Sequence, residues 1–145
     1  MALKVKLLNP KAKLPTVAHP GSDLGYDLYA IEDQLLIPLQ VAEVHLGIAV
    51  EMEPPGFGFL IRDRSSLARK GLMISGGVID AGYRGELVVL MTLLGNILEG
   101  RYLIKQGDKV AQLIPMLPKT HNAIISVDEL TSTERGAAGF GSTGR

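Results

Sequence analysis

Carboxylates, arginines and hydroxyl side chains gather in a few glycine-flanked stretches, and these are the places where this chain can do chemistry. In residues 76–86, glycines bracket two β-branched residues, and Asp80 and Tyr83 follow them. The pattern predicts a β-hairpin that presents backbone N–H and C=O groups to a planar ring, with the aspartate fixed at its tip. Taken alone, the stretch fits equally well an aspartate that only caps its own turn.

A second stretch combines an arginine with two serines, Arg64, Ser65 and Ser66, where the composition predicts a short helix over 65–70. Free backbone N–H groups at a helix start, together with an arginine, suit a phosphate group. The alternative is structural: Ser65 is simply the N-cap, and the nearby cations form a solvated face.

Two polar residues stand at strand positions. Asp27 begins a strand after a glycine-containing loop, and Gln112 lies in an apolar run that follows a Gly-Asp turn. Such an aspartate can support a metal-bound water or orient a neighbour, although turn capping is its commoner use. A buried glutamine needs hydrogen-bond partners; a ligand phosphate is one candidate and the backbone is the default.

The last stretch, residues 135–145, contains four glycines and a single aromatic residue, Phe140. This composition predicts a flexible arm beyond a β domain of residues 1–134, because so many glycines are not ordered by burial. Arg135 can grip a terminal phosphate and Phe140 can stack on a base when the arm closes. The alternative is an ordinary frayed terminus.

Short strands must position these groups. Alternating apolar residues predict half-buried strands over 3–7, 44–52 and 57–61. Segments rich in Val, Ile and Leu and separated by turn residues predict further strands, over 86–94, 101–104, 109–117 and 123–127. Many short strands with one short helix are typical of an all-β sandwich, barrel or jelly roll.

Composition excludes several function classes. Of 145 residues, 46% are hydrophobic, 15 are Lys or Arg and 15 are Asp or Glu, so the net charge of zero predicts no nucleic-acid or acidic-membrane partner. With no cysteine and three scattered histidines, catalysis must use oxygen ligands and carboxylates. The N-terminus is not a signal peptide and no segment is long and apolar enough to span a bilayer, so we expect a cytoplasmic protein.

The order of the stretches along the chain is more specific than any one of them. Together they resemble the five motifs of the trimeric dUTPases, in the order that the family uses and across nearly the whole chain. The blocks are 25–28, 64–68, 77–80 with 82–85, 107–112, and 135–136 with 139–144.

This resemblance implies a distorted jelly roll, a β-clip-like barrel of short antiparallel strands with one short helix and a flexible glycine-rich C-terminal arm. It also implies a homotrimer whose active sites lie between subunits. The implied reaction is Mg²⁺-dependent hydrolysis of dUTP to dUMP and pyrophosphate, which limits uracil incorporation into DNA and supplies dUMP for dTMP synthesis. The magnesium would be held mainly by the substrate phosphates, with no direct protein ligand.

The resemblance also assigns roles. Asp80 would activate a water for attack on the α-phosphorus, and Asp27 would support the site. The residues implied for uracil and deoxyribose are Gly77, Val78, Ile79, Tyr83 and Phe140. Those implied for the phosphates are Arg64, Ser65, Ser66, Gln112, Arg135, Ser142 and Thr143.

Three other interpretations compete with this one. A dCTP deaminase has the same fold, but the essential glutamate of the deaminases corresponds here to Leu90, which cannot transfer protons. The nearest carboxylate, on Glu86, lies about 13 Å away along an extended strand. A non-catalytic regulatory trimer has no need of Asp80 beside a closing arm, and a structural or carbohydrate-binding jelly roll leaves the tail unexplained.

Overall fold

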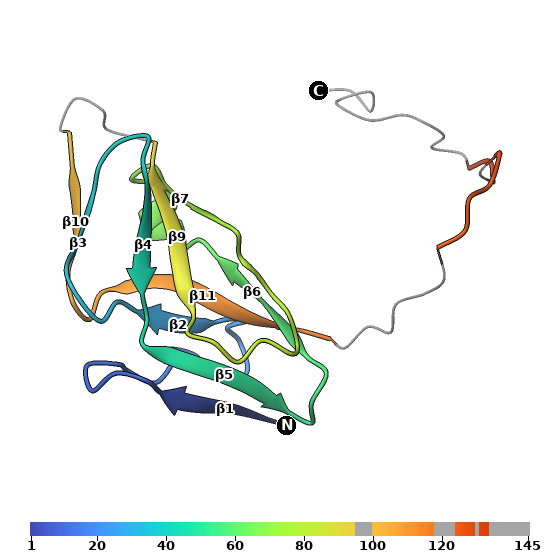
Figure 1. Cartoon of the computed structure of the whole chain (residues 1–145), viewed down its shortest axis with the longest axis horizontal. Helices are drawn as coiled ribbons and strands as arrows, with labels where there is room; N and C mark the ends of the chain where they lie inside the picture. Colours follow the sequence, from blue (N-terminus) through green and yellow to red (C-terminus); the bar gives the residue numbers. More distant parts are fainter. Residues whose placement is uncertain (95–99, 118–123, 130, 134–145) are drawn as a thin grey trace.

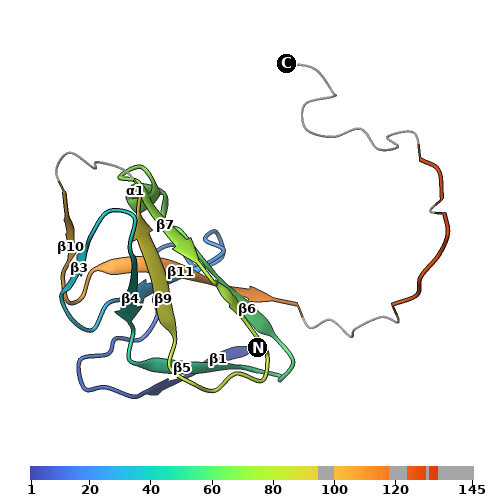
Figure 2. The same ribbon diagram turned by 45° about the horizontal axis from the view of Figure 1, so that its top comes forward.

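The computed structural model describes residues 1–94, 100–117, 124–129 and 131–133. These residues form short strands and one helix of a single turn (Figures 1 and 2). In chain order the elements are β1 (Ala2–Leu7), β2 (Tyr26–Tyr29), β3 (Gln34–Leu36), β4 (Val41–His45), β5 (Ile48–Glu53), β6 (Gly58–Arg62), α1 (Ser65–Ala68), β7 (Leu72–Ser75), β8 (Val78–Ile79), β9 (Val88–Leu93), β10 (Tyr102–Ile104) and β11 (Lys109–Met116).

The named strands pair into small antiparallel sheets that enclose one core. A sheet of order β2-β11-β6-β8 faces a sheet of order β4-β9-β7, and the ribbons β1-β5 and β10-β3 lie at their margins (Figure 1). Alternation explains the core: in β9, Val89, Met91 and Leu93 are buried while the residues between them are half-buried. The predicted all-β class is confirmed, and among the described residues the sheets do not close into a complete barrel.

The expected strand over 44–52 is interrupted at one point. Val44, Leu46 and Ile48 are all buried, as the alternation predicts, but β4 ends at His45 and β5 begins in a different sheet. Gly47 makes this change of sheet, with a φ of 63° that favours glycine. A Cβ there would also lie 2.9 Å from the Asn9 Cβ, so the space between the ribbons requires glycine as well.

The prediction of a β-hairpin over 76–86 is wrong. β7 pairs with β9, from Leu72 opposite Leu93 to Ser75 opposite Leu90, so the stretch belongs to the long connection of a wider hairpin. Within that connection β8 leaves the hairpin and adds to the edge of β6. Period-two alternation does not specify which strand a segment pairs with. Here β8 pairs with the edge of β6 instead of with the segment that follows it in the chain.

Two smaller expectations also need correction. The helix predicted over 65–70 is α-helical only over Ser65–Ala68, and the turn that follows ends at Gly71, whose φ is 79°. The strand predicted over 123–127 is not formed in its described part, 124–127, where Ile124 is fully exposed. A strand needs a partner edge, and none lies beside these residues in the described single chain.

Among the described residues, no helix is both long and apolar enough to cross a lipid bilayer.

Candidate active site

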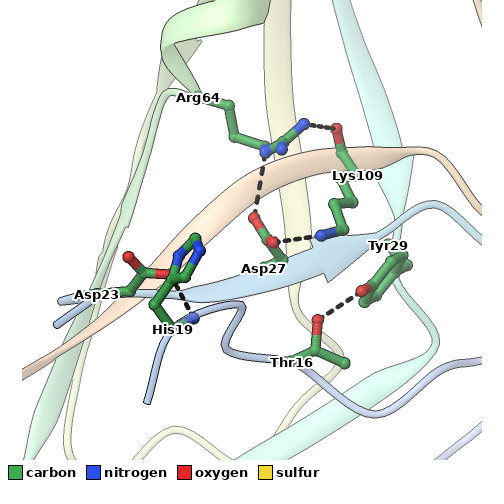
Figure 3. Close-up of polar contacts among 7 residues, drawn as sticks. All are labelled: Thr16, His19, Asp23, Asp27, Tyr29, Arg64 and Lys109. Carbon is green, nitrogen blue, oxygen red and sulfur yellow. Dashed lines mark hydrogen bonds and ion pairs between the residues drawn. The ribbon is translucent and has the colours of Figure 1, made fainter. Parts of the chain in front are cut away.

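The carboxylate of Asp27 is the centre of an ion-paired network at one end of the larger sheet (Figure 3). Arg64 Nε lies 3.1 Å from Asp27 Oδ1, and Lys109 Nζ lies 2.7 Å from Asp27 Oδ2. A guanidinium nitrogen of Arg64, Nη1, donates a further hydrogen bond of 3.2 Å to the backbone carbonyl of Lys109. Each carboxylate oxygen of Asp27 therefore has a cationic donor.

The carboxylate at the centre of this network is buried, whereas the side chains of its two cations are partly exposed. Asp27 is 6% exposed and is the only buried polar or charged residue in the described part of the chain. The hydrogen bond that Lys109 donates to Asp27 raises the pKa of the lysine above its ordinary value of 10.5. One carboxylate faces two cations, so the network keeps a net positive charge next to the start of α1, which suits an anionic ligand.

The strands bring these groups together from distant parts of the sequence. Asp27 in β2 lies opposite Gln112 in β11, and Gln112 lies opposite Arg62 in β6, so the three residues form one row across the sheet. Gly25 permits this close packing, because a Cβ there would lie 3.1 Å from the Gln112 Cβ. Asp27 and Gln112, both predicted from the sequence, are thus neighbours.

The helix start differs from the structural alternative considered for it. The N-cap residue is Arg64, with an extended backbone and no side-chain capping bond, so Ser65 is not the cap. The backbone carbonyl of Arg64 accepts the amides of Leu67 and Ala68. Arg64 and Ser66 line a surface hollow of about 410 Å³ that also includes Lys109. Of the residues predicted for the phosphates, Arg64 and Ser66 therefore border this basic hollow, whereas Ser65 and Gln112 are not among its lining residues.

A second hollow, of about 270 Å³, lies between β8 and β9 and contains most of the residues predicted for the base and sugar. Its predicted members are Val78, Ile79, Asp80 and Tyr83. The lining residues that the sequence interpretation did not assign to the substrate are Gly76, Glu86, Val88 and Leu90. The walls are mostly apolar with one exposed carboxylate, Asp80, at the edge.

Gly77 supports this hollow rather than lining it. Its carbonyl accepts the Ile61 amide at 2.7 Å, and a Cβ on Gly77 would clash with the Ile61 carbonyl oxygen. Only glycine therefore lets the chain lie this close to β6. Next to the hollow, the Tyr83 amide donates to the Asp80 carbonyl at 3.0 Å, and the Tyr83 hydroxyl donates to the Glu86 carbonyl at 3.0 Å.

Both carboxylate oxygens of Glu86 have partners outside the hollow. Its Oε1 accepts the Gly47 amide at 2.8 Å, and its Oε2 lies 3.2 Å from His45 Nδ1. The carboxylate therefore fastens the end of the loop to the point where β4 passes into β5. Leu90, the residue that the sequence comparison set against the deaminase glutamate, is apolar and lines the hollow.

Asp80 and Arg64 lie toward opposite ends of β6. Asp80 is at the Gly58 end, since a Cβ on Gly58 would lie 4.0 Å from the Asp80 carbonyl carbon. Arg64 lies two residues beyond Arg62, at the other end of the strand. The residues of β6 span about 13 Å at roughly 3.3 Å per residue. Asp80 and Arg64 of one chain therefore do not meet at one reacting atom.

Four predicted site residues, Arg135, Phe140, Ser142 and Thr143, lie outside the described residues, as does the whole predicted arm. Among the residues that the structure does describe, no group of three or more His, Asp or Glu side chains is placed to hold a metal ion.

Lys109 and Arg84 are the residues that the sequence interpretation missed. Lys109 lies in a recognised block but was assigned no role, and its contact with Asp27 joins segments 82 residues apart. Arg84 follows Tyr83 and contacts the loop backbone. The only sequence signal for Lys109 and Arg84 is that each is a basic residue inside one of the recognised blocks.

Comparison with known proteins agrees with this geometry. A family model of dUTPases matches residues 10–144. The deoxyuridine 5'-triphosphate nucleotidohydrolase of Clostridium kluyveri is 45% identical over 147 residues, covering 99% of each chain. That of Nautilia profundicola is 40% identical over 148 residues, covering 100% of each.

Solved structures give the same result. The Staphylococcus bacteriophage 80alpha dUTPase with dUpNHpp has a TM-score of 0.86 and 31% identity, covering 99% of both chains. A mutant dUTPase of the S. aureus phage phi11, described as revealing how a structural Mg(II) ion is coordinated, has a TM-score of 0.77 and 29% identity over 89% of this chain and 98% of that one.

The fold is thus the jelly roll of these dUTPases, built from short antiparallel strands. By the extent of the family match and the identity of its full-length relatives, the chain belongs to the dUTPase family.

Proposed function

We propose that this chain hydrolyses dUTP to dUMP and pyrophosphate, with Asp80 activating the attacking water. The observation that carries the proposal is the division of the site into an apolar hollow beside Asp80 and a basic hollow beside Arg64. A deoxynucleoside triphosphate has this division too, with a planar base and sugar at one end and a polyanion at the other.

The hollow between β8 and β9 suits the base and the sugar. Val78 and Ile79 lie on the edge strand β8, whose backbone groups are available to read the donor and acceptor pattern of uracil. Cytosine reverses that pattern at its exocyclic amine, so the same backbone rejects it. Tyr83 closes the wall against the sugar and leaves no room for a ribose 2′-hydroxyl.

The basic hollow suits the phosphates. Arg64, Ser65, Ser66 and Gln112 would hold the chain of phosphates, with Asp27 directing the Arg64 guanidinium. Arg135, Ser142 and Thr143 of the C-terminal arm would complete the grip, and Phe140 would cover the uracil, so that closure of the arm excludes bulk water.

Mg²⁺ fits this arrangement as an ion carried by the substrate. Both oxygens of Asp27 already have cationic donors, so this carboxylate is not offered as a direct metal ligand. A hard cation that keeps several waters and binds phosphate oxygens would neutralise charge on the leaving pyrophosphate. The phi11 dUTPase, described with a structural Mg(II) ion, is consistent with a role for this metal.

The separation along β6 supports a homotrimer with shared sites. A general base must lie within hydrogen-bonding reach of the water it activates, about 2.6–3.2 Å. Asp80 and Arg64 of one chain are on opposite ends of β6, so Asp80 of one subunit would act on phosphates held by Arg64 of another. Exposed apolar residues such as Leu39 and Val41, which are 68% and 62% exposed, are available for such contacts.

The test is to offer dUTP, dCTP, UTP and dTTP with Mg²⁺ and to identify the products. We expect dUMP and pyrophosphate from dUTP, with much slower turnover of the other three. Release of ammonia from dCTP would instead establish a deaminase. Binding of dUTP without turnover would establish a regulatory module.

Mixing inactive subunits tests the shared site. Asp80→Asn and Arg64→Ala variants, each inactive alone, should regain part of the activity when they are unfolded and refolded together, because some mixed sites then contain both native residues. Refolding each variant separately is the control. No recovery in mixed trimers would contradict the sharing.

A further inference from the structure

Arg84 folds its side chain back over the turn that carries Asp80. One guanidinium nitrogen, Nη1, donates to the Ala81 carbonyl at 2.8 Å and to the Tyr83 carbonyl at 2.9 Å. The same turn is closed by the Tyr83 amide, which donates to the Asp80 carbonyl. A single cation therefore holds two of the backbone carbonyls that define the shape of the turn.

The guanidinium is also anchored outside the turn. Arg84 Nε lies 3.1 Å from Oε2 of Glu51, a residue of β5 in the separate β1-β5 ribbon. The other oxygen of Glu51 lies 3.9 Å from Lys4 Nζ on β1. The turn is thus attached to a sheet to which neither β8 nor β9 belongs.

Asp80 depends on this attachment for its position. Its side chain makes no hydrogen bond or ion pair with any residue that the structure describes, and the residue is exposed. Where the carboxylate lies is therefore decided by the backbone of the turn. Two groups hold that backbone at its C-terminal side, Arg84 on Glu51 and Glu86 on the Gly47 amide.

We propose that Arg84 is a positioning residue for the hydrolysis proposed above: anchored on Glu51, it holds the 80–83 turn in the conformation that directs the Asp80 carboxylate to the reacting water. The inference rests on the proposed function for its kinetic readout. The attachment itself is independent of any substrate.

The chemistry of arginine fits this role. Its planar guanidinium donates in several directions at once, so it bonds two carbonyls and a carboxylate together, which the single ammonium of lysine does not reproduce. The side chains of Arg84 and Glu51 are 49% and 40% exposed, and an ion pair that exposed contributes little to global stability. The expected consequence of removing it is therefore a loss of geometry at the turn rather than unfolding.

The chain offers a matched control on the same ribbon. Lys4 pairs with Glu51 and with Glu53, and it forms no hydrogen bond or ion pair with residues 80–83. Lys4→Ala removes a cation from the same carboxylate without touching residues 80–83. We compare it with Arg84→Ala, Arg84→Lys and Glu51→Gln.

Two readouts test the proposal. In steady-state hydrolysis of dUTP with Mg²⁺, Arg84→Ala should lower kcat about 10- to 100-fold with a smaller rise in KM, as expected when a reacting group is displaced by about 1 Å. Arg84→Lys and Glu51→Gln should be intermediate, and Lys4→Ala should match wild type. In hydrogen exchange without ligand, Arg84→Ala should speed exchange in peptides covering 80–86 while the core strands and the melting temperature stay unchanged.

The double variant Arg84→Ala with Glu51→Gln should be no worse than Arg84→Ala alone, because Glu51 acts through Arg84. Wild-type kcat in Arg84→Ala, or exchange that rises equally throughout the chain, would overturn the proposal. If wild type itself does not hydrolyse dUTP, the proposed function fails, and the hydrogen-exchange comparison still decides whether Arg84 holds the turn.

Discussion

The two ends of β6 hold their functional groups by opposite means. At one end, Asp27 is buried and both of its oxygens are bound by cationic side chains from other segments. At the other end, Asp80 is exposed, and its turn is held by hydrogen bonds to backbone carbonyls and by an exposed ion pair. One group is part of the interior of the fold, whereas the other is carried on its surface.

This difference in burial means that substitutions at the two ends should have different effects on folding and on catalysis. Removing the buried carboxylate leaves two neighbouring cations without a counter-charge, and their side chains are only partly exposed to water, which is costly for folding. Changing an exposed carboxylate leaves no such charge, so the fold tolerates it. We therefore expect substitution of Asp80 to lower activity while the fold stays stable. Substitution of Asp27 should lower both stability and activity.

The largest expected effect is at Asp80. Asp80→Asn keeps the size of the side chain but does not accept a proton, so kcat for dUTP should fall about 1000-fold, within the range that general base catalysis contributes. Binding of a non-hydrolysable dUTP analogue, measured by calorimetry, and the melting temperature should be close to wild type. Near-normal kcat in this variant would remove Asp80 from the mechanism.

Next comes Asp27→Asn, which should lower the free energy of unfolding by about 2 kcal/mol, because the hydrogen bonds from Arg64 and Lys109 would no longer be to a charged group. Urea denaturation measures the change. The control is Asp23→Asn, where the lost carboxylate is more exposed and, within the described part of the chain, bonds only to His19. Equal stabilities of the two variants would contradict the greater structural role that we assign to the buried carboxylate of Asp27.

Gly77→Ala tests how β8 is held in place. The added methyl would meet the Ile61 carbonyl, which belongs to rigid backbone, so β8 should be displaced from β6 at a cost of about 2 kcal/mol. Activity should fall as the hollow beside Asp80 deforms. Gly82→Ala is the matched control, since a Cβ there meets nothing within 4 Å. Wild-type stability and activity in Gly77→Ala would show that the backbone of β6 shifts to make room for the methyl group.

The smallest effect is the pH dependence of Lys109. Because its pKa is raised in the fold, the folded state holds the proton more tightly than the unfolded state does. The stabilisation is therefore complete below the ordinary value of 10.5 and is lost as the pH rises through the folded-state pKa. The difference in unfolding free energy between wild type and Lys109→Met should be constant from neutral pH up to that value and shrink above it. A constant difference at every pH would contradict the ion pair with Asp27.

Much of the fold was predictable from local pattern. The alternating residues of 3–7 predicted β1, the run at 109–117 predicted β11, and the few residues around Ser65 predicted the only helix in the described chain. These succeeded because burial of one face imposes a period of two on any half-buried strand. The break at Gly47 was not predicted, because the alternation of apolar residues continues through it while the chain passes from one sheet to another.

The candidate site was predictable as a set of residues but not as an arrangement. Asp27, Gln112 and Arg64 were each recognisable by type and motif, yet their contacts depend on strand register between segments far apart in the chain. Local sequence does not encode a register of that kind, because each strand meets its neighbour only after folding. For the same reason, the sequence did not predict that Lys109 pairs with Asp27 or that Glu51 pairs with Arg84.

By itself, the sequence determined the all-β class, the family and the types of group available for chemistry, since these depend on residue identity and on short-range periodicity. The tertiary structure alone decided that β8 joins β6, that Asp27 is buried between two cations, and that Asp80 and Arg64 lie at opposite ends of one strand. The physical reason is that antiparallel pairing brings distant segments within hydrogen-bonding distance, and the spacing along a strand then sets how far apart its two ends must remain.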